Sequence, residues 1–254
     1  MSKSIKLLIE IGNSKLKASQ LHLDAKGDIT GMHYIGSHTV KEFCHRPNFG
    51  KIGPVDQIVY SNVGNEQNYH HIKALSRKLK VRYQQVSSPT HAFGVTNSYD
   101  SPKKLGVDRW LAFLAAYKDA LAPVVVIDIG TAMTVDLVDA DGCHIGGWIN
   151  PGFRLMNLAL TEHTALVRGG GHHGEELSFG TQTKECVQNG CRAALAGTIL
   201  YAIEKAKSQF DGVQPVLYLT GGGINHLPPE IKKLGKYRPH LVLEGLSLYV
   251  NSSN

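Results

Sequence analysis

The stretch "IEIGNSKLK" (residues 9–17) places an acid, Glu10, and a glycine directly after an apolar strand, and two lysines follow. The stretch "VVVIDIGTAMTVDLV" (residues 124–138) repeats this order, with Asp128 as its acid. In both copies the glycine is followed by a second strand, an Asp/Gly turn and a third strand. The two stretches therefore predict an internal duplication of a β-hairpin unit that carries an acid at its first turn.

The length and charge of the chain agree with a duplicated architecture. With 254 residues, 42% of them hydrophobic, the chain has room for two domains of roughly 110 to 140 residues each. We expect these domains at residues 1–115 and 116–254. The net charge is +6, but the densest basic run, residues 73–82, has the spacing of a solvated helix face. We therefore expect no nucleic-acid partner, and the positive charge suits phosphate-bearing substrates.

The cysteines and the apolar runs predict a cytoplasmic protein. The four cysteines show no CxxC pair and no Cys/His finger spacing, so reduced thiols are expected. No apolar stretch approaches the roughly 18 residues of a membrane span, and the first residues lack the apolar core of a signal peptide. We expect no membrane partner.

Strand and helix patterns alternate along both halves, which predicts an α/β protein with two central sheets. The expected strands of the first half are 5–11, 15–23, 29–36, 57–63 and 81–86, with helical regions at 39–50 and 66–80. Residues 87–109 are expected to form a loop, and residues 109–122 a buried helix that Pro123 ends. After the second hairpin unit we expect a helix at 151–167, a Gly/His loop, a helix at 182–208, a strand at 215–223, and a strand and a helix within 240–251.

Several common site motifs are excluded or fail their context. The chain has no GxxxxGK[ST], GxSxG or HExxH segment. "GGGHHG" (residues 169–174) fits GxGxxG, but it follows a helical pattern where a Rossmann site needs a strand. His172 and His173 have no carboxylate or cysteine at ligand spacing, so an exposed loop is favoured over a metal site.

The hairpin units suit phosphate chemistry without a P-loop. An acid at a strand end can reach a hydrated Mg²⁺, and a following glycine lets the main chain approach an oxyanion. Two such hairpins facing each other across a cleft would hold the phosphates of a nucleotide from both sides. A third glycine turn, "LTGGGINHL" (residues 219–227), follows a strand and can lie against a base or ribose. This turn alone is a weak signal.

These segments resemble the type III pantothenate kinases, the Bvg accessory factor family. The family motif DxGN[ST]xxK corresponds to Glu10–Lys17, and N-x-Y-x-x-P-x-x-L-G-x-D-R-W corresponds to "NSYDSPKKLGVDRW" (97–110). Further matches are "DIGTAMT" (128–134), "GGWINPG" (146–152), Thr183 at a helix start, and "TGG" (220–222). The resemblance runs from residue 5 to about 248, in order.

The resemblance implies a fold, an activity and partners. The fold would be α/β, with two duplicated ribonuclease-H-like (actin-like ATPase) domains, each a mixed β-sheet with flanking helices. The activity would be ATP-dependent phosphorylation of pantothenate to 4'-phosphopantothenate, the first step of coenzyme A biosynthesis. The family uses ATP, Mg²⁺ and a monovalent cation, K⁺ or NH₄⁺. Its members are homodimers with pantothenate near the shared interface.

The resemblance also implies a role for each matching residue. Asp108 would accept the proton of the substrate hydroxyl, and Asp128 would help to hold the monovalent cation. The residues implied for pantothenate are Tyr99, Gly106, Val107, Arg109 and Thr183. Those implied for ATP are Glu10, Ile11, Gly12, Asn13, Ser14, Lys15, Leu16, Lys17 and Thr131.

The residues around Asp108 are consistent with two different roles for it. An acid beside Arg109 at the start of a helix is held in its ionised form and can accept a proton. The same pattern is typical of a structural helix cap with a surface cation. The intact segment around it favours the catalytic reading.

One position departs from the family pattern, because Glu10 stands where the family has aspartate. If the longer acid contacts metal or phosphate tightly, a displacement of about 1 Å could cost on the order of 100-fold in rate. Three hypotheses therefore stay open at this point. The chain is an active pantothenate kinase, a catalytically weak nucleotide-binding regulatory relative, or a kinase of the same superfamily for another hydroxyl acceptor.

Overall fold

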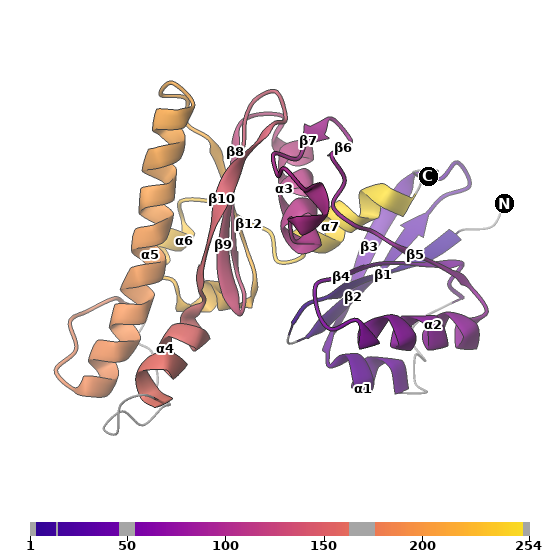
Figure 1. Ribbon diagram of the computed structural model, residues 1–254, viewed down its shortest axis with the longest axis horizontal. Helices are drawn as coiled ribbons and strands as arrows, with labels where there is room; N and C mark the ends of the chain where they lie inside the picture. Colours follow the sequence, from indigo (N-terminus) through magenta and orange to yellow (C-terminus); the bar gives the residue numbers. More distant parts are fainter. Residues whose placement is uncertain (1–3, 14, 46–53, 163–175, 251–254) are drawn as a thin grey trace. The chain divides into compact units, whose positions relative to one another are not determined.

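The computed structural model describes residues 4–13, 15–45, 54–162 and 176–250, which fall into two compact units (Figure 1). The first unit takes its described residues from 1–90, 99–115 and 241–254, and the second takes them from 91–98 and 116–240. The units therefore do not follow the chain as two blocks. The two domains expected at 1–115 and 116–254 stay a prediction.

The first unit is built on a five-stranded mixed sheet in the order β3-β2-β1-β4-β5. Its strands are β1 (Ser4–Ile11), β2 (Leu16–Leu23), β3 (Ile29–His38), β4 (Gln57–Asn62) and β5 (Arg82–Gln85). β1 pairs antiparallel with β2 and parallel with β4. β1 is the central strand, and its last five residues are all buried, as expected for a strand covered on both faces.

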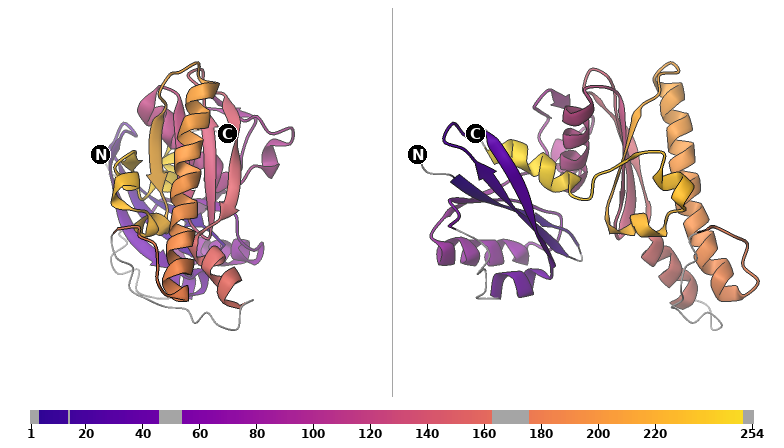
Figure 2. Two further views of the ribbon diagram at one scale, coloured as in Figure 1. Left: turned by 90° about the vertical axis from the view of Figure 1, so that its left-hand side faces the viewer. Right: turned by 180° about the vertical axis from the view of Figure 1, so that it is seen from behind.

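Helices cover both faces of the first sheet. α1 (Val40–His45) and α2 (Gln67–Leu79) lie on one face, where Phe43 and Ile72 join a core with Leu7 and Ile9 of β1 (Figures 1 and 2). α7 (Leu241–Ser247) contacts β1, β2 and β4 on the other face. It is followed by the short helix η3 (Leu248–Val250). Apolar burial on both sides of β1 thus depends on segments from both ends of the chain.

The second unit repeats the same sheet, in the order β10-β9-β8-β11-β12. Its strands are β8 (Val124–Ile129), β9 (Ala132–Val138), β10 (His144–Pro151), β11 (Val216–Thr220) and β12 (Lys236–Tyr237). β8 pairs antiparallel with β9 and parallel with β11, as β1 does with β2 and β4. The predicted duplication, with a mixed sheet and flanking helices in each copy, is confirmed.

One long helix dominates the core of the second unit. α5 (Thr183–Gln209) runs along one face of the sheet (Figure 1) and buries Cys191, Leu195, Ile199 and Ala202 at helical spacing against β8 and β11. α4 (Phe153–Glu162) packs beside it. The smaller elements are β6 (His91–Ala92), β7 (Val95–Thr96), η2 (Gly222–His226) and α6 (Pro229–Lys232).

The expectation of a strand within residues 240–251 is wrong, because the described part of this segment is helical throughout. A short apolar run with one glycine does not distinguish a strand from a buried helix by its pattern. Close packing requires a glycine at position 245, because a Cβ there would overlap the carbonyl oxygen of Leu111. The run is apolar because α7 is buried, and the glycine lets it approach α3.

The bounds of other elements also differ from the expected ones. α3 (Val107–Ala120) begins two residues early and ends before Leu121, which has a φ of 47°. The expected loop at 87–109 contains the hairpin β6–β7 and the short helix η1 (Pro102–Lys104). The expected Gly/His loop, with His172 and His173, lies outside the described residues.

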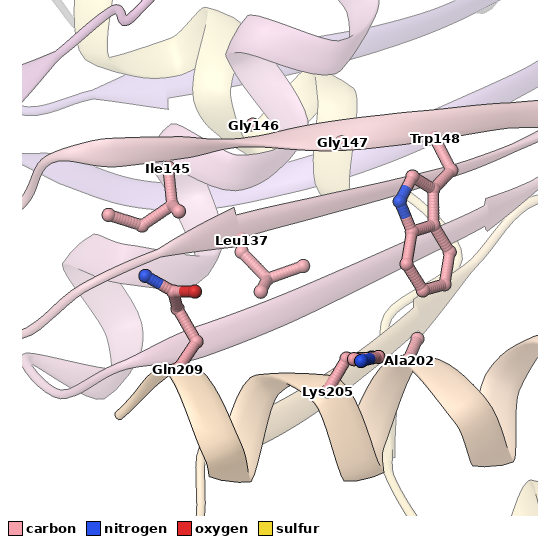
Figure 3. A pocket seen from close by; sticks show the side chains of 8 residues that line it. All are labelled: Leu137, Ile145, Gly146, Gly147, Trp148, Ala202, Lys205 and Gln209. Carbon is pink, nitrogen blue, oxygen red and sulfur yellow. The ribbon is translucent and has the colours of Figure 1, made fainter. Parts of the chain in front are cut away.

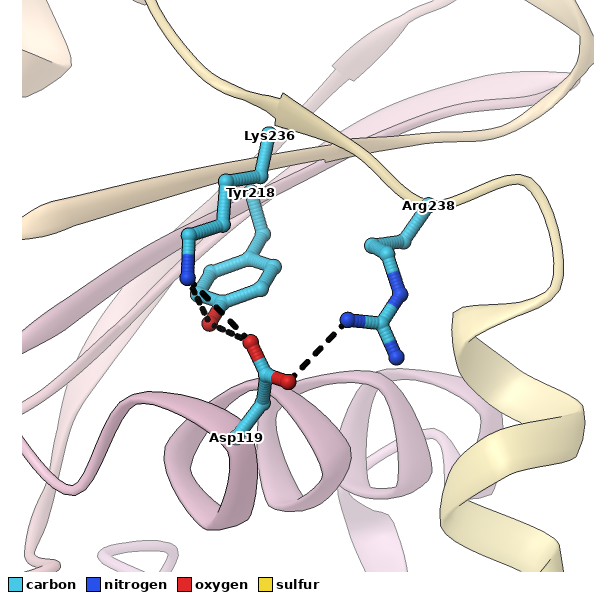
Figure 4. A network of polar contacts seen from close by, with 4 residues as sticks. All are labelled: Asp119, Tyr218, Lys236 and Arg238. Carbon is cyan, nitrogen blue, oxygen red and sulfur yellow. Dashed lines mark hydrogen bonds and ion pairs between the residues drawn. The ribbon is translucent and has the colours of Figure 1, made fainter.

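A polar network fastens the last turn of α3 to the second sheet (Figure 4). The Tyr218 hydroxyl on β11 donates to Asp119, and Lys236 and Arg238 donate to the same carboxylate at 3.3 and 3.1 Å. The bond from Tyr218, together with those from Arg238 and Lys236, lowers the pKa of Asp119 from its ordinary value of 3.8 to about 2. The carboxylate is therefore stabilised in its ionised form in the folded chain.

We expect this network to stabilise the fold down to pH 4 and to weaken below it. Because the pKa of Asp119 is lower in the folded state, its contribution is present above 3.8 and is lost as the pH falls toward about 2. The measurement is the melting temperature of the wild-type protein and of Asp119→Asn between pH 7 and pH 2. The difference between them should shrink below pH 4, and a difference that stays constant would contradict the assignment.

Candidate active site

Glu10 is the penultimate residue of β1 and has one unsatisfied oxygen. It lies opposite Lys17 on β2, whose ammonium donates to Glu10 Oε1 at 3.4 Å. Glu10 Oε2 is buried and has no hydrogen-bond partner among the described residues. Burial raises the pKa of Glu10, Lys17 offsets part of this, and the negative charge of Asp108 adds to the rise. A buried carboxylate oxygen without a donor is suited to a metal-bound water.

A backbone hydrogen bond closes the turn after β1. The Gly12 N–H donates to the Lys15 carbonyl at 3.0 Å, and a Cβ on Gly12 would meet that oxygen at 3.2 Å. Asn13 and Lys15 are exposed, whereas Ile11 and Leu16 are buried in the sheet. Ser14 lies outside the described residues. Of the residues implied for ATP in this motif, the structure thus exposes Asn13 and Lys15, and it buries Ile11 and Leu16 as anchors of the turn.

Asp108 lies in the first turn of α3, two residues after Gly106. Its Oδ1 accepts the backbone N–H of Arg109 at 2.8 Å, and a Cβ on Gly106 would meet the same oxygen at 2.7 Å. The Gly106 carbonyl accepts the first helical hydrogen bond, from Trp110. The positive end of the helix and the Arg109 N–H stabilise the negative charge of this carboxylate. Gly106 leaves the space into which it folds.

Tyr99 and Arg109 form a pair in the same unit as Asp108. Arg109 Nη1 donates to the Tyr99 hydroxyl at 2.8 Å, and the guanidinium carbon lies 5.8 Å from the centre of the tyrosine ring. Arg109 is buried, Val107 is buried, and Tyr99 is half-buried. The structure therefore brings Tyr99, Gly106, Val107, Asp108 and Arg109 to one end of α3. Asp108 is also close enough for its charge to contribute to the raised pKa of Glu10, after burial as the main cause.

The second unit places Asp128 at the equivalent position of its own sheet. Asp128 lies opposite Thr134 on β9 and beside Thr220 on β11. Gly221, with a φ of 92°, follows Thr220 and lies so close that a Cβ there would overlap Asp128 Oδ1 and the Ile129 carbonyl. The strand end of β8 and the glycine turn after β11 thus form one compact group around the Asp128 carboxylate.

The turn after Asp128 is braced by another glycine. The Gly152 N–H donates to the Thr131 carbonyl at 3.0 Å, and a Cβ on Gly152 would lie 2.6 Å from that oxygen. The Thr131 side chain is exposed. Thr183 is the first residue of α5 and is also exposed. Asp128, Thr131 and Thr183 lie within the second unit, and the other predicted residues that the structure describes lie within the first.

The sequence did not single out the turn that follows β4. Ser61 on β4 lies beside Glu10 in the parallel register, and a Cβ on Gly64 would meet the Gly12 carbonyl at 3.0 Å. Asn62 accepts the Gly64 N–H at 3.0 Å and so fixes this turn. The sequence feature that could have indicated this turn is "SNVGN" (61–65), in which an Asn and a Gly directly follow an apolar strand.

A pocket of about 290 Å³ lies between the edge of the second sheet and α5 (Figure 3). Gly146 and Gly147 leave space on β10 beside Trp148, and Lys205 and Gln209 of α5 face it from the other side. Residues Leu137, Ile145 and Ala202 complete the lining. None of the predicted site residues lines this pocket, so it contributes nothing to the case for an ATP or pantothenate site.

Two further findings concern the described part of the chain. Within residues 4–13, 15–45, 54–162 and 176–250, no three His, Cys, Asp or Glu side chains are grouped as a metal site. Among the same residues, no helix has both the length and the apolar character needed to cross a bilayer.

Comparison with known proteins gives a consistent result. Residues 6–205 match the sequence model of the family described as type III pantothenate kinase. A type III pantothenate kinase from Pseudomonas savastanoi pv. phaseolicola is 41% identical over 248 residues, which cover 95% of this chain and 97% of that protein. The one from Pseudoalteromonas atlantica is 32% identical over 248 residues, 96% of each chain.

Solved structures with low sequence identity share the fold. A Baf family protein from Campylobacter jejuni, described as a transcriptional activator, superposes with a TM-score of 0.61 at 23% identity over 96% of both chains. A protein from Listeria monocytogenes, described as an N-acetylmannosamine kinase, gives a TM-score of 0.50 at 13% identity over 96% of this chain and 98% of that one. The predicted actin-like ATPase fold is confirmed by this likeness together with the two matching sheets.

Proposed function

This chain belongs to the type III pantothenate kinase family, and from that premise we propose how its own residues phosphorylate pantothenate with ATP. The activity is that of a phosphotransferase in coenzyme A biosynthesis. The family match spans residues 6–205, and the relatives named for this activity are aligned over nearly their full length. The assignment of roles to single residues is our proposal.

The described residues fit a nucleotide with its metal in two separate groups. In the first unit, Glu10 Oε2 is buried without a partner among the described residues, and Gly12 forms the turn beside it. We propose that Mg²⁺ is held here through water and phosphate oxygens, with Lys15 and Lys17 near the phosphates. When bound, the metal neutralises charge on the phosphates. In the second unit, Asp128 and the exposed Thr131 form the other group, and we propose Asp128 for the monovalent cation.

Asp108 is proposed to accept the proton of the primary hydroxyl of pantothenate. The hydroxyl oxygen attacks the γ-phosphorus of ATP as the bond to the β–γ bridging oxygen breaks, and the proton passes to an Asp108 oxygen. The Arg109 N–H donates to Oδ1 at 2.8 Å and so fixes the orientation of the carboxylate that we propose takes this proton.

The pantothenate site is proposed around the first turn of α3. Arg109 is always charged, and its bond to Tyr99 holds both side chains in place. Gly106 and Val107 supply the wall next to Asp108, and Thr183 is proposed to contact the same substrate. A homodimer and a cytoplasmic location stay predictions. The single observation that carries the proposal is the grouping of Tyr99, Arg109 and Asp108 by the segment that matches the family motif.

The test is ADP release by the purified protein with ATP, Mg²⁺ and pantothenate, in potassium buffer and again in sodium alone. We expect turnover that depends on pantothenate and is faster with potassium. ATP binding without turnover in either buffer would favour the regulatory relative. Turnover with a different hydroxyl compound, and none with pantothenate, would favour the other kinase.

Replacing Glu10 with Asp, the residue of the family motif, is expected to keep or raise turnover. Glu10 Oε2 has no partner to lose among the described residues, so a shorter acid can be compensated by one water. The measurement is kcat at saturating ATP and pantothenate. A loss on the order of 100-fold, the cost of a displacement of about 1 Å, would show that the site is built around the longer acid.

A further inference from the structure

A buried acid–imidazole pair in the second unit lies outside the residues assigned above. His144 on β10 and Asp136 on β9 have side chains with 0% and 2% exposure, and His144 Nε2 lies 3.0 Å from Asp136 Oδ1. The other ring nitrogen, Nδ1, lies 3.1 Å from the Ser98 hydroxyl. Ser98 is exposed and stands 46 positions earlier in the chain. The pair thus reaches out of the core to one surface serine.

The carboxylate determines how these hydrogen bonds run. Asp136 as a carboxylate only accepts, so His144 Nε2 carries a proton and donates it to Oδ1. Nδ1 forms the other hydrogen bond of the ring, with the Ser98 hydroxyl. Because both partners of the ring are fixed, the imidazole has one orientation and can hold Ser98 in one place.

Two backbone contacts dock the same segment to the turn between β9 and β10. The Thr96 N–H donates to the Gly142 carbonyl at 2.9 Å, and Thr96 forms an isolated parallel bridge with Cys143. Gly142 has a φ of 79°, and a Cβ there would overlap the Gly94 carbonyl. The Ser98–His144 bond is therefore the last in a series of contacts that holds residues 94–98 on the second unit.

A Ser–His–Asp series also suggests a nucleophilic triad, but the burial argues against one. In such a triad the imidazole passes a proton to the leaving group and must reach the substrate. The His144 ring has 0% exposure and is bonded at both nitrogens. It can hold Ser98, but it cannot reach a substrate.

Ser98 is the last residue of this segment before the chain enters the first unit at Tyr99. Consecutive Cα atoms are about 3.8 Å apart, so fixing Ser98 limits where Tyr99 can lie. We infer that Asp136 and His144 are positioning residues that hold Ser98 and, through it, place Tyr99 for pantothenate. The inference rests on the proposed function. It predicts an effect on pantothenate binding and none on ATP binding, because the residues proposed for ATP are in other segments.

The test uses initial-rate kinetics on the full chain, with Ser98→Ala as the first variant. We expect the KM for pantothenate to rise about fivefold, the worth of one neutral hydrogen bond, with the KM for ATP unchanged. Ser98→Thr keeps the hydroxyl and should restore the wild-type value. Ser4→Ala is the matched control, because it also removes one exposed serine hydrogen bond, to Asp56 at 2.7 Å. It should change neither KM.

Two substitutions at His144 separate its two bonds. Glutamine reaches the position of Nε2, so His144→Gln keeps a donor to Asp136 and loses the contact with Ser98. It should reproduce the effect of Ser98→Ala. Asparagine reaches the position of Nδ1, so His144→Asn should lower the melting temperature, because Asp136 loses its imidazole, while pantothenate KM changes less.

A double-mutant cycle shows whether Ser98 acts through Tyr99. In a Tyr99→Phe background, Ser98→Ala should have no further effect on pantothenate KM. The inference is overturned if Ser98→Ala leaves pantothenate KM unchanged, if both KM values change equally, or if the effects of Ser98 and Tyr99 add. Wild-type protein without pantothenate-dependent ADP release would instead overturn the proposed function.

Discussion

Replacing Asp108 with Asn is expected to reduce turnover by roughly 100-fold or more, with ATP binding almost unaltered. Asparagine has the same size, and its amide oxygen can still accept the Arg109 N–H that now lies 2.8 Å from Oδ1. The packing against Gly106 is also kept. What is lost is the group that takes the proton of the attacking hydroxyl, so the effect should fall on kcat.

The measurement is kcat at saturating pantothenate together with the dissociation constant for ATP. Asp100→Asn is the matched control, because Asp100 is an exposed acid in the same segment and has no proposed role. It should leave kcat unchanged. Unchanged kcat in Asp108→Asn would remove Asp108 as the base, and lost ATP binding would show that its role is electrostatic.

Replacing Gly221 with Ala is expected to reduce activity by about 100-fold, because the added Cβ forces a shift of about 1 Å near Asp128. A Cβ at Gly221 would overlap Asp128 Oδ1 and the Ile129 carbonyl. The φ of 92° adds backbone strain for any L-residue, on the order of 1–3 kcal/mol. The turn and the carboxylate cannot both stay in place.

The measurement is kcat, the KM for ATP, the dependence of turnover on potassium and the melting temperature. Gly222→Ala is the matched control for stability, because a Cβ there meets nothing within 4 Å. It should keep the wild-type melting temperature. If Gly221→Ala lowers the melting temperature but leaves potassium dependence unchanged, the proposal that Asp128 holds the cation is wrong.

The sheets could be predicted because the sequence contains them twice. The order of acid, glycine, strand and turn in β1–β2 recurs in β8–β9, and the structure gives both copies the same strand order. The local strand pattern and the repeat agree in these segments. An error in predicting the bounds of one strand therefore does not change the predicted sheet. α7 has no second copy, and a short apolar run buried on all sides carries no period that distinguishes a helix from a strand.

The site was predictable only where its residues are close in the sequence. Tyr99, Gly106, Asp108 and Arg109 lie within one segment, and the structure groups them. Their assigned roles stay predictions. Gly64 beside Gly12 could not be predicted, because the contact depends on the parallel pairing of β1 with β4 across 45 residues of intervening chain. Ser98 and His144 are also far apart, and a buried histidine within a strand gives no signal of its partner.

The return of α7 to the first unit has a consequence for how the chain folds during synthesis. β1 leaves the ribosome long before the helix that covers one of its faces, because that helix is formed by residues 241–247. Leu241, Leu243 and Leu246 are all buried there. Until they emerge, that face of the first sheet stays uncovered while the second unit is completed. A nascent chain stalled at residue 240 should therefore bind chaperones through its first half, although most of that half has already been made.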